Sequence, residues 1–308
     1  MYIKKILLPI LIYFFFICSS VNSQENKILF NINNEIITSI DILNEINYLN
    51  ALNDNFKKTE KLQAFEIAKN SLIREKIKEI ELKKVFKEIN LEKNQLNTFL
   101  INYFNSNQIN NMNDLSKFFE EKNLELEFVK KKFTIEIMWN RLIYLKFNKK
   151  VKINEEKIKK EISEKKLHKE YFLYEILFSL DDGEKLDEKY NLIKNTISKE
   201  GFSKAALLYS ISDTSKNDGK LGWIKESSIN ENILGELKKI EIRNFTKPII
   251  IPGGFLILKI DETREINEVV DLEREIQIII KNKTNQQLNQ FSNIYFNKIK
   301  KNLLINEL

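Results

Sequence analysis

Few residues in this sequence could carry reactive chemistry. The 308-residue chain has one cysteine, Cys18, and one histidine, His168. A zinc cluster of Cys and His ligands, a disulfide framework, and any Ser-His-Asp or Cys-His catalytic site that needs a second histidine therefore cannot be built from it. His168 lies outside the nearest predicted strand, so we interpret it as a solvated linker residue. We predict no metal site.

Nucleotide-binding motifs are also absent from the sequence. The chain has seven glycines, and neither G-x-G-x-x-G nor G-x-x-x-x-G-K-[ST] occurs in it. The formal net charge is +6, but the lysines are spread among nearly as many Asp and Glu residues. This pattern indicates a solvated surface rather than a localised basic face for nucleic acid. The sequence therefore predicts no cofactor, no nucleotide and no nucleic-acid partner.

The amino terminus has the pattern of an export signal. Two lysines precede an apolar run over 6–17, and a small-residue cleavage pattern ends at Ser23. The apolar run is shorter than the roughly 20 residues of a membrane span. We interpret 1–23 as a cleaved signal peptide that sends the mature chain to the periplasm. The alternative is an uncleaved anchor in the inner membrane.

Glycine and proline divide the rest of the chain. All seven glycines, and both prolines beyond the signal, lie between residues 183 and 254, and none occurs over 24–182. These residues make tight turns and are costly inside helices. We therefore predict a helical region over 24–167, an α+β domain over 168–264, and a final segment over 265–308.

Local patterns give the elements of the helical region. Two short β-prone runs flank Asn33 and Asn34, which suit a hairpin turn. Thr38 and Asp41 form a capping-box pattern at the start of a helix. The aromatic stripe of the last helix is core packing or, alternatively, a ligand groove, and Lys130–Lys132 is interpreted as its solvated face. Further helices are predicted over 58–88, 91–105, 112–122 and 124–148.

The middle and final segments complete the predicted fold. The middle segment alternates strands and helices in the order β-α-α-β-α-β-β, which predicts a small sheet domain. The final segment has an apolar stripe over 266–303, interrupted near Lys281–Asn285. We expect it to pack on the helical region and to add a strand, Leu303–Ile305, beside Ile28–Ile32. The strands of the middle segment are predicted over 171–180, 219–224, 245–251 and 254–260, and its helices over 185–198, 202–210 and 230–238.

Several of these motifs resemble known families. Ala205–Ser210, Gly219–Trp223 and Gly254–Ile260 are similar to parvulin (PpiC-type) peptidyl-prolyl isomerase domains. Ile32–Leu43 and Asn293–Ile305 resemble the two ends of SurA-type periplasmic chaperones. The resemblance implies an α+β fold in which a helical chaperone module, built from the N-terminal region and the C-terminal helix, carries one inserted parvulin-like domain.

The residues that parvulins use for catalysis are replaced here. By the resemblance, the two family histidines fall at Glu175 and Leu256. The Cys or Asp of the family's polar network falls at Ser212, or at Asp213 in a shifted alignment. Leu256 can neither donate nor accept a hydrogen bond. We therefore expect weak or absent isomerase activity and assign no catalytic residue.

A peptide pocket can persist without that network. By alignment with the family, Leu221, Trp223, Ile229, Ile233 and Phe255 are candidates for a proline or peptide pocket. The same side chains would serve equally as domain core, and the sequence leaves both roles open.

The resemblance also implies a function. It is that of a periplasmic, ATP-independent chaperone that binds unfolded exported polypeptides, outer-membrane β-barrel precursors above all, through an apolar groove. The outer-membrane assembly machinery is a further implied partner. One alternative is an active parvulin-type isomerase in which Glu175 and Ser212 replace the usual network. Another is a membrane-tethered foldase.

Overall fold

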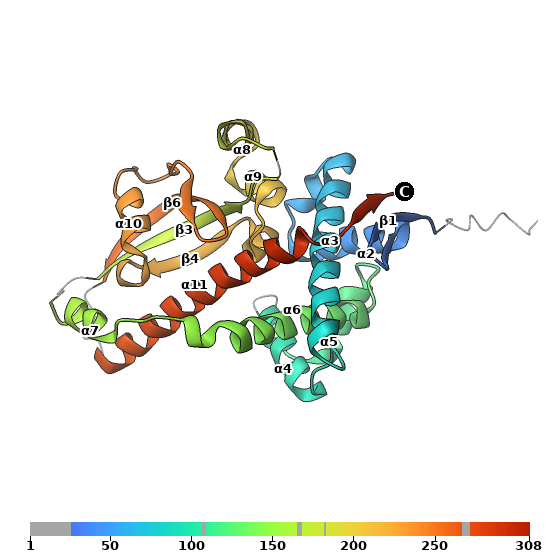
Figure 1. Ribbon diagram of the computed structural model, residues 1–308, viewed down its shortest axis with the longest axis horizontal. Helices are drawn as coiled ribbons and strands as arrows, with labels where there is room; N and C mark the ends of the chain where they lie inside the picture. Colours follow the sequence, from blue (N-terminus) through green and yellow to red (C-terminus); the bar gives the residue numbers. More distant parts are fainter. Residues whose placement is uncertain (1–25, 106–108, 165–167, 182, 267–271) are drawn as a thin grey trace, which may run out of the picture.

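The computed structural model describes residues 26–105, 109–164, 168–181, 183–266 and 272–308. The predicted signal segment 1–23, with Cys18, lies outside the described residues. Within these ranges, no helix has both the length and the apolar character that a membrane crossing needs. The fold is α+β, with a helical module and a small sheet domain joined along the long helix α11, Leu272–Lys300 (Figure 1).

The two ends of the described chain meet in one small sheet. Strands β1, Ile28–Ile32, and β2, Glu35–Thr38, form the predicted hairpin, and Asn33 has the positive φ of 52° that the turn needs. Strand β7, Ile305–Glu307, pairs antiparallel with β1 and places Ile305 opposite Ile32. The sheet order is β2-β1-β7. The predicted strand from the chain end is confirmed, two residues later than expected.

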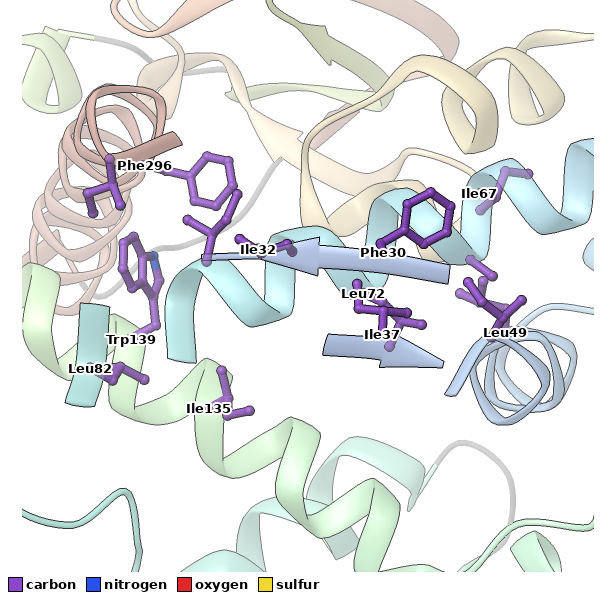
Figure 2. Close-up of a cluster of buried hydrophobic side chains, with 14 of the residues drawn as sticks. Phe30, Ile32, Ile37, Leu49, Ile67, Leu72, Leu82, Ile135, Trp139 and Phe296 are labelled. Carbon is purple, nitrogen blue, oxygen red and sulfur yellow. The ribbon is translucent and has the colours of Figure 1, made fainter. Parts of the chain in front are cut away.

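The helices of the module follow the predicted ones closely. The capping box of Thr38 and Asp41 is present at the start of α2. Helix α6 contributes Trp139 to a core that also includes Phe296 of α11, and Figure 2 shows these side chains beside those of the hairpin. The helices are α2, Ser39–Leu52; α3, Lys61–Val85; α4, Lys93–Phe104; α5, Met112–Glu120; and α6, Leu126–Phe147.

Two expectations about helix α6 have different outcomes. The aromatic stripe supplies core packing, since Val129 and Trp139 are 0% and 1% exposed. The interpretation of Lys130–Lys132 as a solvated face is wrong for Lys132, which is buried. Its ammonium group lies against the carboxylates of Glu45 and Glu75, on α2 and α3. These two carboxylates compensate the buried charge, which a single-helix pattern does not reveal.

The sheet domain has the predicted order of elements. Its strands lie in the order β4-β3-β6-β5, all antiparallel. The strands are β3, His168–Phe178; β4, Lys220–Lys225; β5, Ile249–Ile251; and β6, Gly254–Ile266, and the helices are α8, Leu186–Glu200; α9, Phe202–Tyr209; and α10, Glu231–Leu237.

Three strand boundaries differ from the prediction. His168 opens β3 opposite Ile266, so placing it in a linker was wrong, and β6 extends past the predicted end at 260 because it pairs with the whole of β3. Strand β5 begins at Ile249, directly after Pro248. Proline has no N–H to donate to a strand ladder. Before it, Phe245 makes only an isolated bridge to Lys259.

Helix α11 connects the two parts of the molecule. It runs under the sheet domain from α7, Glu155–Glu164, a helix that the sequence did not predict, to α3 (Figure 1). The helix is continuous through 281–285, where the apolar stripe is interrupted. A second connection lies at the other end of the sheet domain, where Asn53 and Asn55 donate to the carboxylate of Asp218 over 2.9 and 3.1 Å.

Candidate peptide-binding site

The site begins with a hydrogen-bonded cluster on strand β3. Glu175 Oε1 accepts hydrogen bonds from Ser212 Oγ, at 2.6 Å, and from Thr214 Oγ1, at 2.8 Å. Ser212 is the N-cap of a short 3₁₀ helix, Asp213–Asn217, which places both hydroxyls over the strand. Gly219, at φ 74°, lets the following turn approach β3 closely enough for its carbonyl to accept from Glu175 N at 2.7 Å.

Burial raises the pKa of the Glu175 carboxyl above its usual value of 4.5. The hydrogen bonds from Ser212 and Thr214 oppose this shift, and the nearby charge of Asp213 adds to it. Within the described residues, the partners of this carboxylate are hydroxyl groups rather than a cation. A buried carboxyl with only neutral donors is able to change its protonation state at a mildly acidic pH.

Asp213 lies apart from the cluster and faces the helical module. It is exposed to the solvent of a cleft. The positive charge of Lys78 on α3, followed by those of Lys216 and Arg74, lowers the pKa of Asp213 to about 2 despite the opposing effect of burial. Of the two alignments that the sequence left open, the structure places Ser212 on Glu175.

Leu256 and three of the pocket candidates line one cavity. Leu256 lies opposite Leu177 on the face of the sheet that carries Glu175. Leu221, Ile229 and Ile233 border the same cavity, which has a volume of about 460 Å³. Pockets that bind small ligands commonly measure 300–1,000 Å³. Since Ile229 and Ile233 are also nearly buried core residues, the two roles that the sequence left open coincide.

Trp223 and Phe255 do not border this cavity. Side chains alternate along a strand, so Phe255 lies on the opposite face from Leu256 and stacks on Phe178 with 5.5 Å between ring centroids. Trp223 packs edge-on against Phe172 at 5.2 Å. Their assignment to a shared pocket with Leu221 is therefore corrected. The period-two alternation of the sheet separates them from it.

The other walls of the cavity come from the helical module. Arg74 and Lys78 of α3 and Trp139 of α6 border it, and helix α11 closes one side. The residues of α11 that line it are mostly amides: Asn282, Asn285, Gln286, Asn289, Gln290 and Asn293. Among the residues that the structure describes, no group of three or more His, Cys, Asp or Glu side chains is arranged to hold a metal ion.

Comparison with known families identifies the sheet domain. Residues 175–262 match the rotamase family described as a PPIC-type PPIASE domain. The match begins at Glu175 and ends within β6. This chain is a SurA-type protein with one PpiC-type domain. The PpiC-type domain lies between the first helices and α11, so it is inserted into the helical module.

Two curated relatives share this organisation in part. The chain is 25% identical over 154 residues to the chaperone SurA of Pseudomonas putida, covering 46% of this chain and 36% of that protein. It is 22% identical over 156 residues to the chaperone SurA of Pseudomonas aeruginosa, covering 47% and 37%. The chain thus matches little more than a third of the length of these relatives.

Solved structures include similar proteins. One is a crystal structure of a PpiC-type isomerase domain, with 23% identity, a TM-score of 0.30, and coverage of 33% of this chain and 96% of that one. Another comes from work on two SurA-like chaperones of Campylobacter jejuni, with 16% identity, a TM-score of 0.37, and coverage of 92% and 99%.

Sequence reasoning missed several residues of the site. Thr214 is two positions after Ser212 in a polar run, and that run was the available signal for it. No local signal pointed to Arg74 and Lys78, because they reach the PpiC-type domain only through tertiary packing. The interruption of the apolar stripe of α11 was visible in the sequence, and it coincides with the amides that line the cavity.

Proposed function

We propose that this protein is an ATP-independent chaperone of the periplasm that holds unfolded exported polypeptides. The proposed clients are outer-membrane β-barrel precursors, which it would deliver to the outer-membrane assembly machinery. Such clients expose alternating apolar side chains and unpaired backbone groups. A chaperone can hold them by apolar contacts and backbone hydrogen bonds without covalent chemistry.

The cavity between the PpiC-type domain and the module is the observation that carries this proposal. Its sheet wall is apolar, with Leu221, Ile233 and Leu256, and its opposite wall is polar. A proline or branched aliphatic side chain of a client fits the first wall, and its backbone fits the second. The cavity is assembled from both parts of the protein, so holding would depend on their arrangement.

Suppression of aggregation tests the proposal. An unfolded outer-membrane β-barrel is diluted from urea with the full chain, and light scattering is recorded. We expect suppression by the wild type and its loss with Leu221→Glu, which places a charge in the cavity wall. The matched control is Ile250→Glu on the edge strand β5, where the side chain is 80% exposed, and it should hold clients normally. Equal activity of the two variants would contradict the proposal.

A second candidate, prolyl isomerisation, is favoured by one observation. The cluster of Glu175, Ser212 and Thr214 is assembled beside the apolar wall, where a polar network would assist rotation of a peptide bond. Leu256 offers no hydrogen bond on the other side. We therefore expect exchange of an X-Pro peptide at the uncatalysed rate of tens of seconds in NMR exchange spectroscopy. Turnover that disappears with Glu175→Ala would establish the isomerase instead.

A further inference from the structure

Helix α11 presents an uncharged stripe of amides to the cavity. The six amides that line it recur at spacings of three and four residues, which places them on one face of the helix. Elsewhere the exposed surface of α11 carries charges, at Glu273, Arg274, Lys281 and Lys298. A helix face that only needed solvation would be served equally by such charges. The amide stripe is defined here as Asn282, Asn285, Gln286, Asn289, Gln290 and Asn293.

The hydrogen-bonding groups of the amide stripe are free. Within the described part of the chain, none of the six side chains makes a hydrogen bond to the protein, whereas two amides of α11 outside the cavity do. Gln287 accepts from Lys152 N at 3.0 Å and donates to Lys152 O at 2.8 Å. Asn297 donates to the carbonyl of Gly253 at 3.2 Å. The stripe therefore keeps both donors and acceptors available to a ligand in the cavity.

The contact of Gln287 shows what such an amide does with an extended chain. Lys152 lies in a stretch without regular structure between α6 and α7, and one side-chain amide satisfies both of its backbone groups. A side-chain amide has the same donor and acceptor as a peptide group, so this pairing is independent of the side chain it meets. The amides on the cavity side offer the same pairing to a chain that enters from outside.

We propose that the amide stripe of α11 binds the backbone of an extended, unfolded polypeptide segment, while the apolar wall of the PpiC-type domain takes its side chains. From Asn282 to Asn293 the helix rises by about 16 Å, which matches about five residues of extended chain. Because the stripe is uncharged, it reads peptide groups rather than sequence or charge. This inference rests on the proposed chaperone function and names the chemistry by which clients are recognised.

Peptide binding tests the inference with a backbone-modified probe. The probe is a fluorescein-labelled ten-residue peptide of Ala, Ser, Val and one Pro, compared with a copy in which alternate peptide nitrogens are methylated. Fluorescence anisotropy is measured with the full chain and with the combined variant Gln286→Met, Asn289→Leu, Asn293→Leu. The matched control is Gln277→Met, an exposed amide of α11 outside the cavity.

We expect the combined variant to bind the unmodified probe about tenfold more weakly, because each lost hydrogen bond weakens the complex. The control should bind within about twofold of the wild type. The methylated probe should bind the wild type about tenfold more weakly, and the combined variant should weaken it no further. Unchanged binding of the unmodified probe by a folded combined variant would overturn the inference.

Two further readouts keep the outcomes distinct. If the wild type neither binds the probe nor suppresses aggregation, the proposed function fails and this inference fails with it. If it does both and the combined variant does both equally well, only the inference fails. Should circular dichroism show that the combined variant is unfolded, a probe carrying a photoreactive phenylalanine is crosslinked to the wild type. Crosslinks within 282–293 support the amide stripe, and their absence there refutes it.

Discussion

The helical module and the PpiC-type domain each bury a glutamate, and they compensate it differently. Glu45 of the module is 0% exposed and accepts from Ser71 Oγ at 2.6 Å and from Lys132 Nζ at 2.5 Å. Glu175 of the domain has the hydroxyls of Ser212 and Thr214 instead. A buried charge needs a partner, and a cation compensates it more fully than neutral donors do.

This difference separates a structural role from a functional one. Lys132 joins α6 to α2 and α3, and the two carboxylates raise its pKa against the effect of burial. It stays charged throughout the physiological range. At Glu175 burial is the dominant effect and raises the pKa of the carboxyl. The charge of the module is therefore fixed, and the charge of the domain is adjustable beside a cavity.

Loss of the buried cation should have the largest effect on this comparison. Lys132→Met leaves Glu45 and Glu75 buried without a cation and should lower the free energy of unfolding of the module by about 3–5 kcal/mol. The chain has two tryptophans, Trp139 in the module and Trp223 in the domain. Urea unfolding followed by ¹⁹F NMR of 5-fluorotryptophan therefore reports each region separately.

Two controls sharpen this measurement. Lys131 is next to Lys132 but half exposed and 3.5 Å from Glu79, so Lys131→Met should cost less than about 1 kcal/mol. Replacing Lys132, Glu45 and Glu75 together by Met and Leu should recover much of the loss, since no charge is then left unpaired. Equal costs of the two single lysine variants would show that the buried cation does not stabilise the module.

The next largest effect is expected at a glycine beneath the site. A Cβ on Gly219 would lie 2.3 Å from the carbonyl oxygen of Glu175 and 2.9 Å from Ala206 Cβ. At Gly222, with a similar positive φ of 80°, a Cβ would meet nothing within 4 Å. Gly222→Ala should therefore cost only the backbone strain of about 1–2 kcal/mol. Gly219→Ala should cost at least about 2 kcal/mol more, because the backbone must move.

The signal of Trp223 in thermal unfolding of both glycine variants provides the measurement. Similar melting temperatures for the two variants would mean that the turn yields without cost, and the close approach to β3 would then not be what holds the cluster of Glu175. The signal of Trp139 should stay unchanged in both, since neither glycine contacts the core of the module.

Features fixed by neighbouring residues were predictable from the sequence. The turn at Asn33 and the capping box of Thr38 and Asp41 depend on contacts within a few residues, and both are present. Glu175, Ser212 and Leu256 could be named because they belong to motifs of one family, and the structure brings Glu175 and Ser212 into contact.

Features decided by distant residues were not predictable in this way. The burial of Lys132 depends on Glu45 and Glu75, which are 87 and 57 positions away. Phe255 was placed in the pocket by its motif, although the alternation along β6 directs it to the other face. The wall of the cavity formed by α11 exists only because the PpiC-type domain packs against that helix.

The pH dependence of stability tests the adjustable charge of Glu175. The raised pKa means that the folded domain binds this proton more tightly than the unfolded chain does. Its contribution is fully present below the usual value of 4.5 and is lost as the pH rises through the higher folded pKa. The free energy of unfolding of the domain should therefore fall as the pH rises from 4.5 through this window.

Glu175→Gln should remove this slope and change the stability by no more than about 1 kcal/mol at neutral pH, because the amide oxygen still accepts from Ser212. Urea unfolding of the domain, followed at Trp223 from pH 4 to pH 8, provides the measurement. The matched control is Glu188→Gln on the exposed side of α8, which should keep the slope of the wild type. A slope that survives in Glu175→Gln would assign the titration to another group.

The smallest effect is expected where the two regions touch. Asp218 has a φ of 59° and accepts from Asn53 and Asn55, and Asp218→Gly removes both bonds while keeping the backbone conformation. The docking of the domain on the module should weaken by about 1–2 kcal/mol. Small-angle scattering should show a larger radius of gyration, while the unfolding midpoints at Trp139 and Trp223 stay unchanged. Asn217→Ala is the control.

This last variant decides whether the comparison of the two regions holds. If the module and the domain are separately stable, weaker docking opens the cleft without unfolding either, and the binding of extended polypeptides should become weaker because α11 and the apolar wall move apart. If the two ¹⁹F signals of Asp218→Gly shift together, the regions unfold as one unit. The buried charges of Glu45 and Glu175 would then contribute to a single stability, and their different compensation would not separate a structural role from a functional one.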